Sequence, residues 1–229
     1  MKILAMDSSS QALAVALLDE SRLVAELTLN IKKNHSISLM PTVDFLVASV
    51  GWTPADLERI VVAQGPGSYT GLRVAVATAK TLAYALKIDL VGVSSLYALA
   101  AACPATGLVV PLMDARRNHV YAGFYEKGQA QAPDAHMAFP EVLEKVASAQ
   151  KVTFVGEVAA FRSQIEEVLP QAEICESLPS AFEIGKLGQH LPAVPVHAFV
   201  PHYLKRVEAE ENWLKQNEAG SEADYIKRV

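Results

Sequence analysis

Three glycines within seven positions, Gly65, Gly67 and Gly71, lie in the stretch QGPGSYTGLRVAVATAK, between a short apolar run and an alanine-rich one. Glycine-rich turns that open a helix can hold phosphate on backbone N–H groups. A Walker loop requires GxxxxGK followed by Ser or Thr, whereas Leu72 follows Gly71 here. The nucleophile elbow GxSxG does not fit either, because a glycine directly precedes the serine. We therefore interpret the glycines as a structural loop that permits positive φ and close backbone approach, with Thr70 capping the next helix.

Two aspartates each end a short apolar run: Asp7 ends LAMD, and Asp114 ends PLMD in the second half of the chain. Carboxylates are the usual ligands of the metal ion that accompanies a nucleotide. Two lobes with such aspartates facing each other across a cleft resemble the actin, sugar-kinase and heat-shock ATPase superfamily, whose cleft binds nucleotide phosphates and a metal. The resemblance implies that Asp7, Ser8, Ser9 and Asp114 can hold a nucleotide weakly at a shared cleft. The alternative is structural, because aspartate at the end of a strand is a common turn former.

The histidines and cysteines do not predict a metal site. His35 stands alone ahead of a helix, and one imidazole cannot complete a metal site. Only His197 and His202, in an apolar segment, show paired spacing among the others. Cys103 and Cys175 are far apart in sequence and lack CxxC spacing, so we expect reduced, buried thiols and no disulfide.

The hydrophobic pattern predicts the elements that position these residues. Apolar runs at Ile3–Met6, Leu13–Leu18 and Leu23–Leu29 indicate an antiparallel meander, and those at Ile60–Ala63 and Leu90–Val93 indicate buried strands. Two helices are expected, at 37–50 and 72–86. Strands that alternate with helices after the opening hairpins indicate an α/β class with a mainly parallel core.

The second half repeats the order of elements of the first half. PLMD echoes LAMD, each is followed by a polar turn, a second strand and a charged turn, and VTFVG echoes IVVAQG. This order predicts a duplication. We expect a first lobe at 1–103, a second, smaller lobe at 104–202, and a C-terminal segment at 203–229 that joins the first lobe.

Composition restricts the function classes. The 229 residues are 51% hydrophobic, carry a net charge of −5 and have a pI of about 5.7, which disfavours an RNA-binding module that holds nucleic acid by its own charge. The apolar run before Asp7 is too short for a signal peptide, and no later stretch is long enough for a membrane span. We expect a cytoplasmic protein with no membrane association.

Several motifs together resemble the TsaB (YeaZ) family of bacterial tRNA threonylcarbamoyladenosine (t6A) biosynthesis: DSSSQALAVAL, the lone His35, QGPGSYTGLRVAVATAK, GVSSLYALA, MDARRNHVYAGFY and PHYLKR. The resemblance covers nearly the whole chain, and GPGSYTGLR is its most specific element. It implies two ribonuclease-H-like lobes of the actin, sugar-kinase and Hsp70 (ASKHA) type. It also implies a homologous catalytic partner, TsaD, which transfers a threonylcarbamoyl group to the adenosine beside the anticodon, and a TsaE-like ATPase.

The resemblance implies that this chain is not the catalytic subunit. The catalytic relative grips a metal with two histidines one helical turn apart, whereas Leu39 stands four positions after His35. Glu157 follows Gly156 where a nucleotide-binding turn favours a small neutral residue. We expect a non-catalytic activating subunit without a tightly bound cofactor, which meets ATP or ADP and tRNA only within the complex. The alternative is a free-standing enzyme of the same fold, either an ATP-dependent phosphotransferase using Asp7 and Asp114 or a metalloprotease-like enzyme.

The two first-lobe helices carry more apolar and small surface than one sheet face needs, and a surplus of this kind indicates an interaction site. A basic stripe runs along the second helix, and small residues allow a partner helix to approach closely. We expect this surface to bind the catalytic partner, and to form a homodimer when the chain is alone. The expected interface residues are Ile37, Met40, Val43, Val47, Arg73, Val76, Ala79, Lys80 and Ala83.

Overall fold

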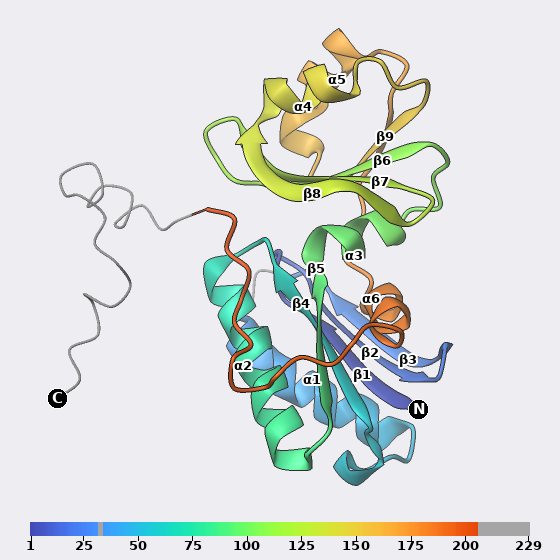
Figure 1. The fold of residues 1–229 in the computed structure, drawn as a ribbon, viewed down its shortest axis with the longest axis vertical. Coiled ribbons are helices and arrows are strands. Elements are labelled where there is room, and N and C mark those ends of the chain that lie inside the picture. The colour runs from blue at the N-terminus through green and yellow to red at the C-terminus, as the bar shows by residue number, and fades with distance from the viewer. Residues whose placement is uncertain (32–33, 206–229) are drawn as a thin grey trace, which may run out of the picture.

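Two five-stranded mixed sheets form the framework of the chain (Figure 1), in a computed structural model that describes residues 1–31 and 34–205. The first sheet has the order β3-β2-β1-β4-β5. Its first three strands form the predicted antiparallel meander, and β4 and β5 extend it in parallel with β1. The bounds are β1 Lys2–Asp7, β2 Leu13–Asp19, β3 Arg22–Leu29, β4 Arg59–Gly65 and β5 Asp89–Ser94.

The second sheet repeats this topology strand for strand. Read from its meander edge, its order is β8-β7-β6-β9-β10, with two antiparallel pairs followed by two parallel ones. The predicted duplication is thus visible as two copies of one sheet, in which β6 corresponds to β1 and β9 to β4. The bounds are β6 Leu108–Asp114, β7 His119–Glu126, β8 Gln129–Ala138, β9 Val152–Gly156 and β10 Glu173–Cys175.

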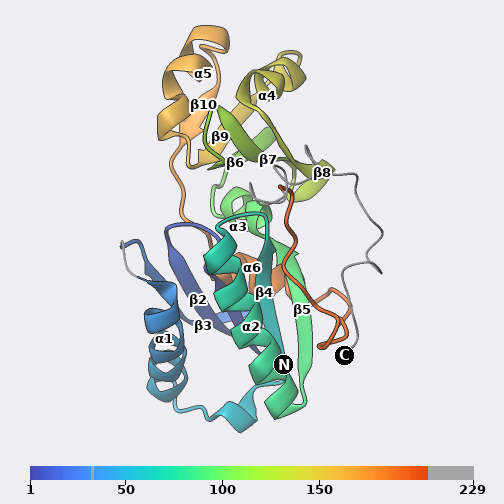
Figure 2. The same cartoon turned by 90° about the vertical axis from the view of Figure 1, so that its left-hand side faces the viewer.

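Long helices cover one face of the first sheet. The helices α1 (His35–Ser49) and α2 (Tyr69–Leu86) pack there side by side (Figure 2), and their buried residues form one core with alternate residues of β1, β2 and β4. Pro41 lies inside α1, two turns from its start. Ser68, not the predicted Thr70, caps α2, because the Ser68 side chain accepts a hydrogen bond from the Gly71 N–H. A 3-10 turn, Pro54–Asp56, leads from α1 toward β4.

The corresponding helices of the second sheet are short. They are α4 (Phe139–Val146) and α5 (Arg162–Val168), the latter preceded by a 3-10 turn at Ala159–Phe161. They pack with β6, β7 and β9 around Phe139 and Phe154, which are both fully buried. The second lobe therefore has a complete core but a smaller helical layer.

The last helix of each half of the chain packs against the sheet of the other half. The helix α3 (Ser95–Ala101) follows β5, yet it lies between the lobes (Figure 1) and packs against β6 and β7 through Leu96 and Leu99. The helix α6 (Ala181–Gly188) follows β10, yet it packs on β1 and β2 of the first sheet. The predicted second lobe, 104–202, therefore differs from the structure at its end, because apolar residues of α6 cover the free face of the first sheet.

Residues 194–205 form an extended segment along the first lobe, here called the C-terminal strap. Its backbone is held where the Val194 N–H donates to the Leu90 carbonyl (2.8 Å) and the His202 N–H donates to the Gln64 carbonyl (2.7 Å). Phe199 is buried in the α1–α2 core. Tyr203 contacts Arg73 and Tyr69 of the first lobe, whereas residues 206–229, the rest of the segment predicted to join it, lie outside the described residues.

Candidate functional site

The glycine loop packs directly on the β1–β2 turn. A Cβ atom on Gly67 would lie 2.3 Å from the Ser9 carbonyl oxygen, and one on Gly71 would lie 2.0 Å from the Ser8 carbonyl oxygen. Hydrogen bonds join the same segments, from the Ser68 N–H to the Ser9 carbonyl (2.6 Å) and from the Ser8 hydroxyl to the Gly71 carbonyl (2.8 Å). Gly67 has φ +153°, whereas Gly71 lies within α2 without a positive φ, so space and not conformation requires glycine there. The loop covers the turn, and its close approach to the Ser8 and Ser9 carbonyl oxygens requires glycine at both positions.

Asp7 is sealed beneath this loop. Its side chain is completely buried; Oδ1 accepts the Ser9 N–H at 2.7 Å, and Oδ2 has no hydrogen-bond partner among residues 1–31 and 34–205. Burial raises the pKa of Asp7 to about 6, against the lowering effect of the Ser9 hydrogen bonds and of His35. Ser8 and Ser9 are buried with it. Three of the four residues predicted to hold a nucleotide are therefore interior in this conformation.

Asp114, the fourth residue, is exposed at the cleft between the lobes. Its Oδ1 accepts the Arg116 N–H at 2.7 Å, the same turn that Asp7 makes with Ser9. Asp7 and Asp114 therefore occupy equivalent positions in the two sheets, but they do not face each other across the cleft as predicted. The reason is that the α2 loop covers the first turn, and the second lobe leaves its turn open.

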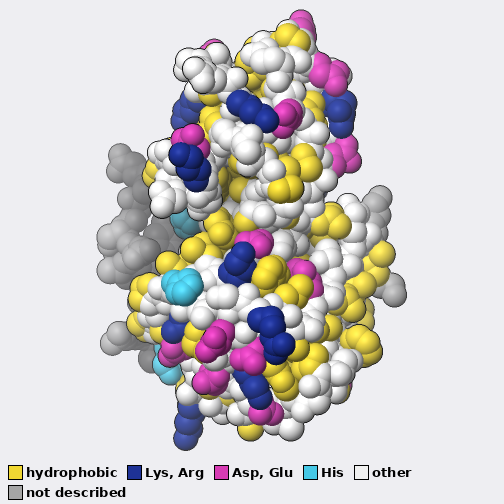
Figure 3. All heavy atoms as spheres, turned by 90° about the vertical axis from the view of Figure 1, so that its right-hand side faces the viewer, with side chains coloured by type: hydrophobic (Ala, Val, Ile, Leu, Met, Phe, Trp, Pro, Cys, Tyr) yellow, Lys and Arg dark blue, Asp and Glu magenta, His cyan; other side chains and the backbone are white. Residues whose placement is uncertain are grey.

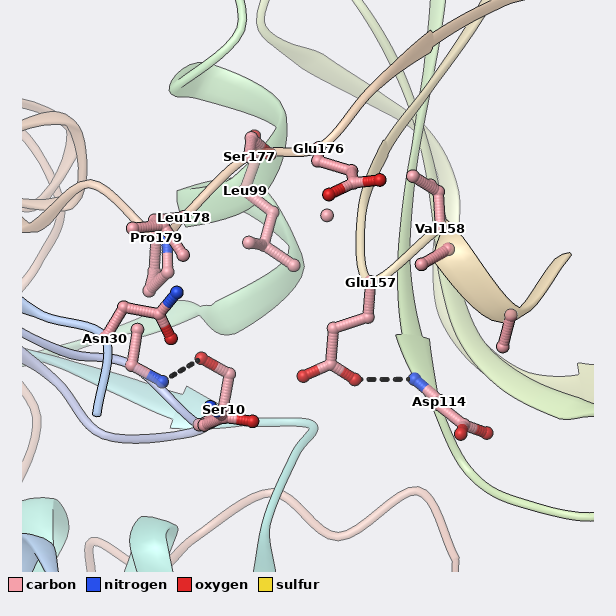
Figure 4. Close-up of a pocket in the computed structure, with 15 residues that line it drawn as sticks. Ser10, Asn30, Leu99, Asp114, Glu157, Val158, Glu176, Ser177, Leu178 and Pro179 are labelled. Carbon is pink, nitrogen blue, oxygen red and sulfur yellow. Dashed lines mark hydrogen bonds between the residues drawn. The ribbon is translucent and has the colours of Figure 1, made fainter. Parts of the chain in front are cut away.

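The cleft is a cavity of about 560 Å³ that carries three carboxylates, Asp114, Glu157 and Glu176 (Figure 4). Glu157 projects between Ser10 of the first lobe and Asp114, and its Oε2 accepts the Asp114 N–H at 2.9 Å. Burial and the Asp114 charge raise the pKa of Glu157, although that hydrogen bond lowers it. Negative charges at this density repel phosphate groups. The adjoining cavity of about 470 Å³ shares Asp114 and Glu157 and adds Arg116 and Lys205.

A polar cluster connects the two lobes beside this cleft. Ser94, at the start of α3, shares a hydrogen bond with the Asp134 carboxylate of β8, and the Tyr125 hydroxyl of β7 donates to the same carboxylate at 3.0 Å. Burial raises the pKa values of Asp134 and Tyr125. Sequence reasoning missed this cluster, because its three members lie on separate strands and share no motif. The cluster links the first lobe to the second through partly buried hydrogen bonds.

His35 lies at the first turn of α1 without a second imidazole. Its Nε2 atom is 3.1 Å from the Gln11 carbonyl oxygen, and Leu39, one turn later, is buried in the core. Within 1–31 and 34–205, the structure contains no group of three or more His, Cys, Asp or Glu side chains that could hold a metal ion. The ligand chemistry of these residues therefore does not fit a metal centre at α1.

The predicted interface residues separate into two sets. Ile37 and Met40 are exposed, at 72% and 43%, and so is Phe45 at 59%, so α1 carries large apolar side chains on its outer side. The other apolar members lie in the core between the helices and the sheet, so they cannot contact a partner, and their prediction as interface residues is wrong. These buried residues are Val43, Val47, Val76, Ala79 and Ala83.

The basic stripe of α2 is occupied by the chain's own C-terminal strap. The Lys80 ammonium donates to the carbonyls of His197 (3.1 Å) and Phe199 (2.7 Å). Arg73 donates to the Tyr203 hydroxyl (3.2 Å) and lies 4.1 Å from the centre of the Tyr69 ring. The stripe that the sequence assigned to a partner is thus an intramolecular contact, although Arg73 remains exposed.

The surface shows no large basic area on the face in Figure 3, where acidic and basic side chains are interspersed over both lobes. Among the described helices, none is long and apolar enough to cross a bilayer. The functional surfaces that remain are the acidic cleft and the outer side of α1 and α2.

Comparison with known proteins agrees with this architecture. A model of the family described as tRNA N6-adenosine threonylcarbamoyltransferase, TsaD, matches residues 22–213. The chain is 40% identical over 226 residues to the tRNA threonylcarbamoyladenosine biosynthesis protein TsaB of Bacillus subtilis, which covers 94% of this chain and 99% of that protein. Escherichia coli TsaB is 30% identical over 132 residues, 56% of this chain and 57% of that protein.

Solved structures show the same arrangement of lobes. YeaZ from Pseudomonas aeruginosa superposes with a TM-score of 0.75 at 28% identity, over 89% of this chain and 99% of that one. The 2-hydroxyisocaproyl-CoA dehydratase activator of Clostridium difficile, with a TM-score of 0.51 at 12% identity, shares the fold over 96% of this chain and 100% of that one. The predicted fold, two duplicated lobes of the ASKHA type, is confirmed.

Proposed function

This chain belongs to the TsaB (YeaZ) family of tRNA threonylcarbamoyladenosine biosynthesis proteins, and we propose that it is the non-catalytic subunit that binds and activates a TsaD-like threonylcarbamoyltransferase. In this proposal the partner carries out the transfer to the adenosine beside the anticodon, a TsaE-like ATPase joins the assembly, and tRNA is contacted only through the complex. All of these act in the cytosol.

The exposed apolar side of α1 is the observation that carries the proposal. Ile37, Met40 and Phe45 lie within nine positions and expose 72%, 43% and 59% of their surface. Large apolar side chains gathered on one helix indicate a protein-binding surface. On the neighbouring helix, Ala77 and Ala85 are exposed, and small side chains of this kind allow a partner helix to pack closely.

The chemistry of the cleft supports a non-catalytic role. Glu157 and Asp114 occupy the cavity between the lobes, and Asp7 is sealed away from it. Phosphate would meet the Glu157 carboxylate before any of the buried serines. The carboxylates oppose phosphate in this part of the cleft, although Arg116 and Lys205 line the adjoining cavity, so ATP or ADP binds, in this proposal, only within the complex.

An Ile37→Asp variant tests the proposed surface, with Val168→Asp on α5 as its matched control. Both side chains are more than half exposed, at 72% and 53%, so neither change buries a charge in the free chain. Isothermal titration with the TsaD of the same organism should show at least tenfold weaker binding for Ile37→Asp and unchanged binding for Val168→Asp. Equal binding by all three chains would exclude α1 from the interface.

Stimulation of the transferase tests the activity directly. Adding this chain to TsaD, the TsaE-like ATPase, tRNA and the threonylcarbamoyl donor should raise t6A formation, and Ile37→Asp should lower that stimulation in proportion to the lost binding. ATP hydrolysis or peptide cleavage by this chain alone, abolished by Asp114→Ala, would contradict the proposal and favour a free-standing enzyme.

A further inference from the structure

Both cysteines lie where the chain passes between the lobes. Cys103 follows α3 on the outward connection, residues 102–107, and Cys175 ends β10 just before the return connection, residues 176–180. Both pack against the same apolar cluster, which includes Leu99 and Val155. The Cys103 thiol lies close enough to the Cys175 thiol for the two to interact, and both residues are partly exposed.

The fold brings the two connections together through α3. The Ser177 hydroxyl donates to the Leu99 carbonyl at 3.3 Å, and the Ser180 N–H donates to the Ala98 carbonyl at 3.2 Å, so the return connection runs along the helix that Cys103 follows. β10 pairs in parallel with β9, so Cys175 is placed opposite Val155 of the same cluster. The approach of the two cysteines could not be predicted, because they are far apart along the chain.

We propose that Cys103 and Cys175 form a reversible oxidation site, at which a disulfide joins the outward and return connections and closes the base of the second lobe. The oxidant is a small disulfide such as oxidised glutathione. One cysteine thiolate attacks a glutathione sulfur and releases one glutathione thiolate. The second cysteine then attacks the mixed disulfide, forms the Cys103–Cys175 bond and releases the second glutathione, so two thiols are oxidised and one disulfide is reduced.

The environment sets the rate of this reaction. Burial, the neighbouring Cys175 and the Glu173 carboxylate raise the pKa of the Cys103 thiol to about 11. The thiolate is the attacking species, so attack by Cys103 is slow near neutral pH and accelerates as the pH rises. Solvent still reaches both sulfur-bearing residues, so a small disulfide has access to them.

The bond would close a loop that contains the whole second sheet, from β6 to β10. A cross-link across a loop of this length restricts the unfolded chain strongly. It would also fix the two connections on which any movement of one lobe relative to the other depends. Oxidation would therefore raise the unfolding temperature and narrow the range of lobe orientations.

Equilibration of the full chain with mixtures of oxidised and reduced glutathione tests the site. After trapping with a maleimide, peptide mapping should find Cys103 joined to Cys175, and both thiols should disappear together. In Cys103→Ser and Cys175→Ser, the remaining cysteine should form a mixed disulfide only at a glutathione ratio at least tenfold more oxidising. In concentrated urea the wild-type chain should need the same glutathione ratio as the single-cysteine variants, because the fold no longer holds the two thiols together.

Two results would overturn the proposal. One is that the two thiols of the folded wild-type chain are oxidised independently. Each would then form a mixed disulfide with glutathione, and peptide mapping would find no disulfide between Cys103 and Cys175. The other is a joined peptide without any rise in the unfolding temperature of the oxidised chain relative to the reduced chain, because the bond would then not tie the lobe together. An oxidised unfolding temperature several degrees higher, reversed by a reductant, is the expected result.

Discussion

The two lobes share a strand topology and a strand-end aspartate, and they differ in what covers that aspartate. In the first lobe the 18-residue α2 and its glycine loop lie over the β1–β2 turn, so Asp7 is fully buried. In the second lobe the corresponding helix, α5, has seven residues, and Asp114 remains open to the cleft. The same local turn, with Oδ1 accepting the N–H two residues later, thus gives a sealed carboxyl in one lobe and an accessible one in the other.

This difference separates two tasks. The first lobe has the long helices, the exposed apolar side chains of α1 and the C-terminal strap, and it is the lobe that we propose to bind a protein partner. The second lobe supplies Asp114, Glu157 and the short helices, so it determines the charge of the cleft. The two copies of one topology therefore differ in their exposed apolar surface and in the charge that they bring to the cleft.

The largest loss in the free energy of unfolding is expected when a charged side chain is placed in the core beneath α2. Ala79 is completely buried, whereas Ala77 is exposed on the same helix. Ala79→Asp should lower the free energy of unfolding by at least about 4 kcal/mol, because an unpaired carboxylate is buried. Ala77→Asp should leave stability within about 0.5 kcal/mol and weaken partner binding.

Urea unfolding measures the change in stability caused by each alanine substitution, and titration with TsaD measures the change in partner binding. An Ala79→Asp chain that folds normally and loses only the partner would mean that α2 turns its Ala79 side outward in the complex. The assignment of the two sides of α2 would then be reversed.

Gly67→Val tests whether close packing of the glycine loop on the β1–β2 turn stabilises the first lobe. Its Cβ would lie 2.3 Å from the Ser9 carbonyl oxygen, and the main chain there cannot yield easily, so a loss of about 3 kcal/mol is expected. Gly51→Val is the control, because Gly51 also has a positive φ (+73°) but nothing lies within 4 Å of its added Cβ. Its loss should be about 1 kcal/mol, from backbone strain alone. A Gly67→Val chain of normal stability that no longer activates TsaD would indicate contact with a ligand or partner.

The fold could be predicted well from the sequence, because each strand is a short apolar run and the order of elements repeats. LAMD and PLMD marked equivalent strand ends, and the meander and both long helices lie close to their predicted bounds. The exchange of α3 and α6 between the lobes could not be predicted. Both helices are apolar enough to cover a sheet, and nothing in their sequences says which sheet.

The candidate site was harder to predict, because burial depends on neighbours from elsewhere in the chain. The apolar spacing of α1 correctly indicated a helix, but residues such as Val43 and Val47 face the sheet, whereas Ile37 and Met40 of the same pattern face outward. Lys80 was expected at a partner surface and instead contacts the strap. Only the three-dimensional path of residues 194–205 reveals that contact.

The two strand-end aspartates should respond differently to neutralisation. The folded chain keeps the Asp7 proton up to about pH 6, whereas the unfolded chain loses it near pH 3.8, so burial of Asp7 destabilises the fold increasingly as the pH rises between these values. Asp7→Asn should therefore raise the free energy of unfolding by about 3 kcal/mol at pH 7.5, and by roughly half as much at pH 5. Asp114→Asn should change it by less than about 0.5 kcal/mol at either pH.

Urea unfolding of the wild-type chain and both asparagine variants between pH 5 and pH 8 measures these effects. The difference between each variant and the wild type removes the contributions of other titrating groups. A gain from Asp7→Asn that stays constant with pH, or an equal gain from Asp114→Asn, would show that the covered and open turns do not differ in electrostatic environment.

The smallest effect on stability is expected in the C-terminal strap, which packs on the first lobe. The half-buried Lys80 ammonium donates to two strap carbonyls, and charged hydrogen bonds at a partly exposed site contribute about 1 kcal/mol. Lys80→Met keeps the apolar stem and removes the donor, whereas Lys80→Arg keeps a donor and should restore most of the loss. Hydrogen exchange gives the local measurement: the His202 amide, which donates to the Gln64 carbonyl, should exchange about fivefold faster in Lys80→Met, and amides of β9 should not change. Equal acceleration in β9 would mean that Lys80 stabilises the whole chain, because the loss would no longer be confined to the strap and the lobe beneath it.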